Sequence, residues 1–232
     1  MEKIVLDQAD GLRRLMGGNT AKRVAVIDSP ASAGVCSVTQ NLAAALMQQG
    51  QDVLLLDECV GPQAMPLARD GRLVLVNAVL DPDGALSTLA ASTDHILVVF
   101  QANAQAITQA YLRIKKLHYA HAFQHLRVLV NEADDPVQAQ RMLANLATTG
   151  SRYLGLDLQT AGFVRADPLL AQASRLNLTV VQAFRTSSAA RDFCRIAADL
   201  LQWPRSPAAS RTPSLLPGRI TRPEAPAVAG MH

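Results

Sequence analysis

Apolar residues occur along this chain in short continuous runs, separated by longer stretches in which they recur at helical spacing. The runs predict six buried strands, at 24–27, 53–56, 73–76, 96–100, 126–130 and 160–164. The helical patterns lie at 1–16, 37–49, around Leu86 and Leu89, and at 104–118, 138–148, 168–175 and 187–202. Regular alternation of strand and helix predicts an α/β fold, with a doubly wound, mostly parallel sheet and helices on both faces.

Changes in composition divide the chain into three parts. Residues 1–16 place apolar side chains at helical spacing between charges, and a pair of glycines then ends the pattern. We therefore predict a short amphipathic helix at 1–18, followed by a folded domain at 19–203. Half of the chain's 12 prolines fall after residue 203, among Ser, Ala and Arg, which predicts a disordered tail at 204–232.

Composition and charge narrow the classes of function. Apolar residues make up 49% of the chain, enough for a large core. The formal charge of +3 falls in the tail, which holds four arginines against one glutamate, so the folded body is nearly neutral. A neutral body gives no strong nucleic-acid signal. No stretch reaches the ~18 apolar residues that a membrane-spanning helix needs.

The cysteines Cys36, Cys59 and Cys194 are widely spaced and share no ligand pattern with histidine. We therefore predict neither a disulfide framework nor a metal site, and a reducing cytoplasm suits this usage. The N-terminus shows no signal-peptide pattern. Cys36 and Cys59 could be neighbours in the fold, where we expect them to be small buried residues that fill space. A redox or metal role is the alternative.

The loop after the first strand occupies the place where a strand–loop–helix unit can bind phosphate. A phosphate-binding loop needs glycines, a lysine for the β- and γ-phosphates, and a Ser or Thr for Mg²⁺. This loop, SPASAGVC at 29–36, has Gly34 as its one glycine and no lysine. Pro30 also lacks a backbone N–H donor. The loop alone therefore predicts no phosphate site beyond the weak anion preference of a helix N-terminus.

The sequence after this loop carries a family resemblance. Residues 37–46, with the glycine at position 50 and the run VLLLD at 53–57, resemble the segment that follows the deviant Walker A loop, GKGGVGKT, of MinD/ParA ATPases. Alignment on this segment places Pro30 at the signature lysine and Val35 at the P-loop lysine. Cys36 falls on the Ser/Thr that binds magnesium. The resemblance thus implies a MinD-like P-loop fold whose phosphate-binding residues have changed.

Two further motifs of that family extend the same interpretation. The family's D-x-D corresponds to Asp57, Glu58 and Cys59, and the Asp and Gly of its D-T-x-x-G correspond to Asn77 and Asp81. Asn131 lies where the family places an Asn that contacts adenine. The resemblance therefore implies a vestigial nucleotide site, made of Gly34, Val35, Cys36, Asp57, Asn77 and Asn131. The family's cofactors are ATP and Mg²⁺, but we expect no cofactor here, no catalytic residue, and ATP hydrolysis that is lost or strongly impaired.

The N-terminal segment carries a second resemblance. Asp7, Gln8, Ala9, Leu12 and Arg13 match the DQAxxLR motif of the flagellar-number regulators FlhG/FleN, and residues 106–111 and 187–191 resemble two further segments of that family. The resemblance implies that this helix binds FlhF, a GTPase of the signal-recognition type, and stimulates its GTP hydrolysis. Gln8 would enter the partner's catalytic site, while Leu12 and Arg13 would anchor the helix. A helix that packs its apolar stripe on its own domain is the alternative.

Three functions remain open. The first is a non-catalytic regulator of flagellar number and placement, in the cytoplasm or recruited by its partner to the cell pole or membrane. Flagellar switch (C-ring) components or a flagellar transcription regulator are further candidate partners. The second is an active ATPase with an atypical site, for which Lys22 lies at the wrong end of the first strand. The third is an adaptor that binds DNA or membrane through the basic tail.

Two assembly modes of the family are not expected here. An ATP-dependent homodimer needs the signature lysine, which Pro30 replaces, so we predict a monomer or a dimer that does not respond to ATP. The last helix has an apolar face that includes Phe193 and Ile196, but its other positions include Asp192 and Asp199. Membrane-binding helices carry a basic polar face, so packing on the sheet is predicted and membrane attachment is doubtful.

Overall fold

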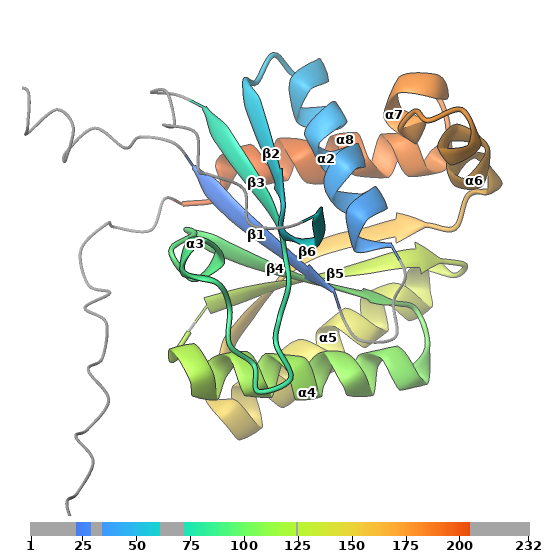
Figure 1. Ribbon diagram of the computed structural model, residues 1–232. Helices are drawn as coiled ribbons and strands as arrows, with labels where there is room; N and C mark the ends of the chain where they lie inside the picture. Colours follow the sequence, from blue (N-terminus) through green and yellow to red (C-terminus); the bar gives the residue numbers. More distant parts are fainter. Residues whose placement is uncertain (1–21, 29–33, 61–71, 124, 205–232) are drawn as a thin grey trace, which may run out of the picture.

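The computed structural model describes residues 22–28, 34–60, 72–123 and 125–204, and these residues form one central sheet with helices around it (Figure 1). The strands are β1 (Arg23–Asp28), β2 (Val53–Asp57), β3 (Leu73–Ala78), β4 (His95–Gln101), β5 (His125–Ala133) and β6 (Asp157–Arg165). Their order across the sheet is β2-β3-β1-β4-β5-β6, and every neighbouring pair is parallel. The predicted parallel α/β sheet is therefore confirmed.

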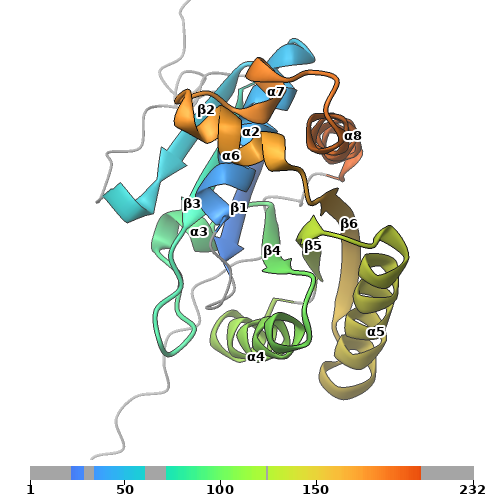
Figure 2. The same cartoon turned by 90° about the vertical axis from the view of Figure 1, so that its right-hand side faces the viewer.

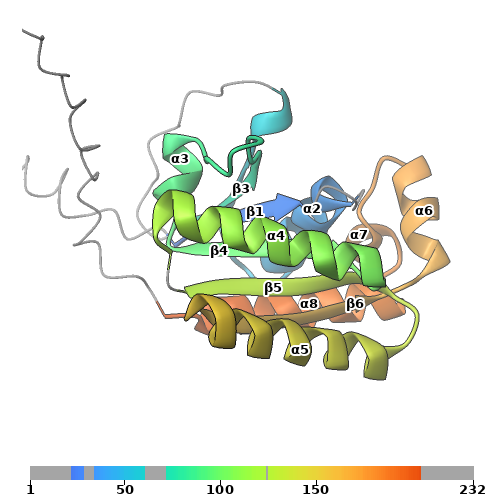
Figure 3. The same ribbon diagram turned by 90° about the horizontal axis from the view of Figure 1, so that it is seen from below.

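Helices cover both faces of this sheet (Figures 2 and 3). One face carries α3 (Thr88–Ala91), α4 (Ala104–His121) and α5 (Pro136–Leu154). The opposite face carries α2 (Val35–Gln48), α6 (Pro168–Arg175), α7 (Val180–Ala183) and α8 (Ser188–Gln202). A short 3-10 turn, η1 (Glu58–Val60), follows β2. This is the doubly wound arrangement that the alternating pattern predicted.

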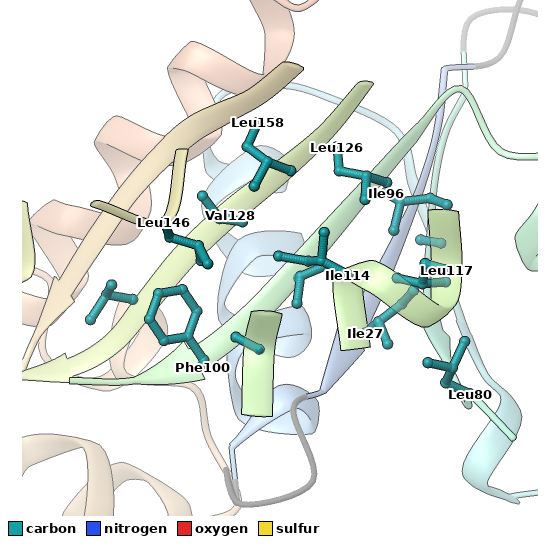
Figure 4. Close-up of a cluster of buried hydrophobic side chains, with 14 of the residues drawn as sticks. Ile27, Leu80, Ile96, Phe100, Ile114, Leu117, Leu126, Val128, Leu146 and Leu158 are labelled. Carbon is teal, nitrogen blue, oxygen red and sulfur yellow. The ribbon is translucent and has the colours of Figure 1, made fainter. Parts of the chain in front are cut away.

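Each face of the sheet has its own apolar core. Figure 4 shows the core beneath α4 and α5, where Phe100 of β4, Ile114 of α4 and Leu146 of α5 meet. On the other face, α2 and α8 bury Leu42, Leu46 and Phe193 against the strands. Because both faces are buried, strands such as β3 and β4 are apolar at nearly every position and do not alternate.

The last helix packs on the sheet, as predicted, through Phe193, Ile196, Ala197 and Leu200, which are all buried. The Lys22 Nζ atom closes its C-terminal end, donating to the carbonyls of Leu200, Leu201 and Trp203 at 2.8–2.9 Å. Free carbonyls at a helix C-terminus favour such a cation. Lys22 thus acts at the end of the sheet opposite to the start of α2. Among the described residues, no helix is long and apolar enough to cross a membrane.

Several predicted helix bounds differ from the structure. α5 runs to Leu154, six residues beyond the predicted end, and α3 begins only at Thr88. Leu86, expected in that helix, instead forms an antiparallel bridge with Leu80. α7 and η1 were not predicted. The predicted N-terminal helix at 1–18 lies outside the described residues, as does the predicted tail at 204–232 apart from its first residue.

Candidate functional site

The candidate site lies at the carboxyl edge of the sheet, where parallel strands and the start of α2 meet, which is where such folds bind ligands. Asp57 is the last residue of β2 and pairs in register with Asn77 of β3. Asn131 lies near the end of β5. The loop at 29–33, which includes Pro30, lies outside the described residues. The fold therefore brings Asp57, Asn77 and Asn131 from separate strands to the one edge that the resemblance predicted.

The first turn of α2 begins at Gly34, Val35 and Cys36. No side chain of the described residues caps this helix start, and the Gly34 carbonyl accepts the first helical bond, from the Val38 N–H at 2.8 Å. Val35 is only 7% exposed and packs into the core with Val38 and Leu42. Cys36 faces outward. The positions that the resemblance assigns to a lysine and a hydroxyl thus hold a buried apolar side chain and a thiol.

Asn131 lies directly against the start of α2. A Cβ atom placed on Gly34 would come within 2.8 Å of the Asn131 Nδ2 atom, so only glycine permits this approach. The pairing of β5 with β6 is irregular after Val130, and Glu132 has a φ of 54°. This irregularity ends the regular strand beside Asn131. Asn131 is 4% exposed, and its Oδ1 atom has no hydrogen-bond partner among the described residues.

Asn77 is the centre of a polar cluster at the same edge. Its Nδ2 atom donates to Asp57 Oδ1 at 2.8 Å and to Cys36 Sγ at 3.1 Å, and it lies 3.7 Å from Cys59 Sγ. Asp57 Oδ1 also accepts from the Cys59 N–H at 3.0 Å. Asn77 is 1% exposed, and its Oδ1 atom lacks a partner within the described ranges. The one retained acidic residue of the predicted site is therefore engaged in hydrogen bonds within the protein.

The two cysteines of the site are neighbours but are not buried. Cys36 and Cys59 both contact Asn77 and are both exposed, so the prediction that they fill buried space was wrong. The reason is that each lies at an outer end of its element: Cys36 in the first turn of α2, and Cys59 in η1. Partial burial, the charge of Asp57 and contact with the Cys36 thiol together raise the pKa of Cys59.

Sequence reasoning missed two residues that shape this edge. Glu58 accepts from the Val79 N–H at 3.1 Å and from the Ser87 hydroxyl, so it ties η1 to the segment after β3. Arg113 of α4 is half-buried, and burial lowers its pKa while the charge of Asp28 at the end of β1 opposes this effect. Glu58 and Arg113 each act on residues that are far away in the sequence, so no local sequence pattern predicts their roles.

The residues described at this edge do not fit a magnesium–triphosphate group. Val35 offers no cation and Cys36 no hydroxyl. No group of three His, Cys, Asp or Glu residues within the described ranges could hold a metal ion. The unpartnered Asn77 and Asn131 oxygens are acceptors and cannot bind phosphate oxygens. Among the described residues, the positions that would contact the phosphates and Mg²⁺ therefore lack the lysine and the hydroxyl that phosphoryl transfer in this fold requires.

The predicted partner-binding residues form a separate group. Asp7, Gln8, Ala9, Leu12 and Arg13 lie outside the described residues. Their assignment therefore remains a prediction from the DQAxxLR resemblance.

Comparison with known proteins agrees with this fold. MinD of Aquifex aeolicus superposes with a TM-score of 0.61 at 14% identity, over 80% of this chain and 99% of that one. MinD of Pyrococcus horikoshii, solved as a Mg-ADP complex, gives a TM-score of 0.56 at 13% identity, over 78% and 96%. The sequence is 31% identical to the antiactivator FleN of Pseudomonas aeruginosa over 132 residues, which are 57% of this chain. The described residues thus share the fold of MinD, and part of the sequence is similar to FleN.

Two facts limit the extent of the similarity to FleN. The aligned segment spans 47% of FleN, so the MinD-like chain matches about half the length of that relative. No family model matches the sequence. The structural similarities establish the MinD fold, while the similarity to FleN adds a relationship in sequence.

Proposed function

We propose that this MinD-like chain is a regulator of flagellar biosynthesis, controlling flagellar number and placement by binding partners and not by hydrolysing ATP. The observation that carries the proposal is the start of α2, where Val35 is buried in the core and Cys36 contacts Asn77. A nucleotide switch of this fold needs a lysine and a hydroxyl at these positions. Their absence favours a protein that keeps the scaffold of an ATPase for binding alone.

The partner we propose is a GTPase of the signal-recognition type, similar to FlhF. The DQAxxLR motif supports this partner, because a glutamine presented to a GTPase can orient the attacking water. Gln8 would take that role, while Leu12 and Arg13 would hold the segment on the partner. A short amphipathic segment with a few anchors is a known recognition mode.

The sequence similarity to FleN supports a second class of partner. FleN is named an antiactivator, a protein that opposes an activator. We propose a flagellar transcription regulator as a further partner, with flagellar switch components as the alternative. The body carries no strong nucleic-acid signal, so regulation would act on the regulator protein and not on DNA.

We further propose that the chain is cytoplasmic and reaches the cell pole or membrane through its partner. It would be a monomer, or a dimer that does not respond to ATP, because Pro30 stands at the position of the signature lysine. Sedimentation with and without Mg²⁺–ATP tests this. Equal mass in both conditions is expected, and a dimer that forms only with ATP would overturn the proposal.

The test of the GTPase proposal is GTP hydrolysis by the purified FlhF-like partner, with and without the full chain. The native chain should stimulate hydrolysis. Gln8→Ala should bind the partner but lose stimulation, while Leu12→Ala should lose binding. Arg14→Ala is the matched control, because it changes a charge in the same segment outside the motif. Equal stimulation by the native chain and Gln8→Ala would show that Gln8 does not act in hydrolysis.

The rival function is an ATP-binding switch with an atypical site. Asn131 favours it, since its buried Oδ1 atom lacks a partner within the described residues and could accept from a base. An amide acceptor alone holds no phosphate, so this function would require positive charge from elsewhere. Measurement of ATP binding to native and Asn131→Ala chains separates the two functions.

A further inference from the structure

Two cysteines from separate elements meet at one buried amide. Cys36 lies in the first turn of α2, and Cys59 lies in η1, directly after β2. The Asn77 Nδ2 atom is 3.1 Å from the Cys36 sulfur and 3.7 Å from the Cys59 sulfur. A single donor thus contacts both sulfur atoms. Both cysteines are exposed, so a small reagent can reach them from solvent.

The two thiols also affect each other directly. Contact with the Cys36 thiol is one of the influences that raise the pKa of Cys59, after burial and the charge of Asp57. A disulfide needs an S–S distance of about 2.0 Å and Cβ atoms about 3.5–4.5 Å apart. Both sulfur atoms lie within 3.7 Å of the same Asn77 nitrogen, so the proposed disulfide would require the two side chains to turn toward each other. The third cysteine, Cys194, lies on α8 and contacts Gln48 at the C-terminal end of α2, whereas Cys36 lies at its N-terminal end.

We propose that Cys36 and Cys59 are a redox-modification site, in which a peroxide converts the two thiols into an intramolecular disulfide. This proposal goes beyond the regulatory function above and does not rest on it. It requires the proximity of the two thiols and their exposure, and neither depends on the partner or on ATP.

The chemistry uses one equivalent of hydrogen peroxide. One cysteine sulfur attacks a peroxide oxygen, the O–O bond breaks, and a sulfenic acid and one water form. The second cysteine sulfur then attacks the sulfenic sulfur, the S–S bond forms, and the hydroxyl leaves as a second water after taking up a proton. The two sulfur atoms together lose two electrons, and the peroxide gains them. A cellular dithiol reverses the reaction by thiol–disulfide exchange.

The disulfide would join the start of α2 to the end of β2. Those two elements border the edge that carries Asp57 and Asn77. Oxidation would therefore link the start of α2 covalently to η1, and reduction would release that link. The edge that corresponds to the nucleotide site would thus respond to oxidation in place of ATP.

The experiment maps the disulfide in the full native chain. The reduced protein is treated with a small excess of hydrogen peroxide, and its free thiols are counted with a chromogenic disulfide reagent. Cleavage before aspartate follows under non-reducing conditions, because it separates Cys36, in fragment 28–51, from Cys59, in fragment 57–69. Trypsin would leave both cysteines in one peptide. Mass spectrometry then identifies any linked pair.

We expect two of the chain's three thiols to be lost, a linked pair of fragments 28–51 and 57–69, and full recovery with dithiothreitol. Cys194→Ser is the matched control and should still form the link. Cys59→Ser should leave Cys36 trapped as a sulfenic acid. Linkage between molecules, linkage through Cys194, or irreversible oxidation of one cysteine without any linked pair would overturn the proposal. The measurement on the native chain requires no variant to fold.

Discussion

The Nδ2 atom of Asn77 lies 2.8 Å from the Oδ1 atom of Asp57, across the carboxyl ends of β3 and β2. An amide that donates to a carboxylate stabilises the pair, whereas two carboxylates at this distance would repel each other. The MinD/ParA resemblance predicts an aspartate at the Asn77 position, where Mg²⁺ would keep two acids compatible. In this chain the asparagine replaces that repulsion with a hydrogen bond to Asp57.

Replacement of Asn77 by aspartate should therefore destabilise the protein. Asn77→Asp removes the donor and places a second charge next to Asp57, at a position that is 1% exposed. We expect a loss of about 1–3 kcal/mol of unfolding free energy at pH 7. The two carboxylates repel each other most strongly when both are ionised. The loss of unfolding free energy should therefore become smaller as the pH falls toward 4. Urea denaturation at both pH values measures this.

The control for that change is Asn77→Ala, which removes the donor without adding charge. Its loss should be smaller at pH 7 and nearly independent of pH. If Asn77→Asp is as stable as the native chain at pH 7, the two carboxylates do not repel each other and this account of the Asn77–Asp57 pair is wrong.

A buried ion pair between β6 and α8 gives a second prediction. Arg165 Nε lies 2.8 Å from Asp192 Oδ2, and the side chain of Asp192 is 4% exposed while that of Arg165 is 37% exposed. Arg165→Met leaves the buried carboxylate with the more distant Arg195, whose Nη2 atom lies 3.5 Å from Asp192 Oδ1, and we expect a loss of about 2 kcal/mol. Asp192→Asn should cost less, because the arginine left behind can turn to solvent. Equal losses in thermal denaturation would contradict this asymmetry.

Arg191→Met serves as the matched control for the Arg165 variant. It removes an arginine from the exposed face of the same helix, α8. Its unfolding free energy should stay within about 0.5 kcal/mol of the native value.

Asp167 should make stability depend on pH. Burial acts to raise the pKa of Asp167, but hydrogen bonds from the N–H groups of Ala189 and Leu169 and from the Ser188 hydroxyl outweigh it and lower the pKa. A carboxyl with a lowered folded-state pKa stabilises the fold above its unfolded value of about 3.9, and this stabilisation is lost as the pH falls through the folded value. Asp167→Asn should cost about 1 kcal/mol at pH 7 and almost nothing near pH 2. A difference that stays constant over this range would contradict the prediction.

The strands could be predicted from sequence because each is a nearly continuous apolar run between turn residues. The same runs placed Asp57, Asn77 and Asn131 at strand ends, and the rule that parallel strands end at one edge then predicted their proximity. These inferences depend on local pattern and general topology, which a single sequence contains.

The end of α5 could not be predicted, because packing against the following strand, β6, decides it. Its last turns contain Thr148, Thr149 and Gly150, which favour helix weakly. Each threonine hydroxyl donates to the carbonyl four residues earlier, at 2.9 and 2.7 Å. Gly150 packs against Leu158 of β6, where a Cβ would lie only 2.3 Å from the leucine side chain. Tertiary packing thus extends a helix beyond its local preference.

The exposure of the Cys36 and Cys59 side chains could also not be predicted from the sequence. Cys36 follows the buried Val35, and Cys59 follows the half-buried Glu58. The hydrophobic pattern does not show which way a side chain points in the first turn of a helix. The contact of both thiols with Asn77 depends on how η1 bends after β2, and Glu58 directs that bend by binding Val79 and Ser87. Such polar contacts between distant segments leave no periodic signal.

We propose that this chain does not use ATP, and titration calorimetry with Mg²⁺–ATP tests this proposal most directly. The purified chain should give no heat of binding up to millimolar nucleotide, because Val35 and Cys36 replace the lysine and the hydroxyl. Saturable binding in the micromolar range, abolished by Asn131→Ala, would contradict the account. It would then restore the ATP-dependent switch as the leading function.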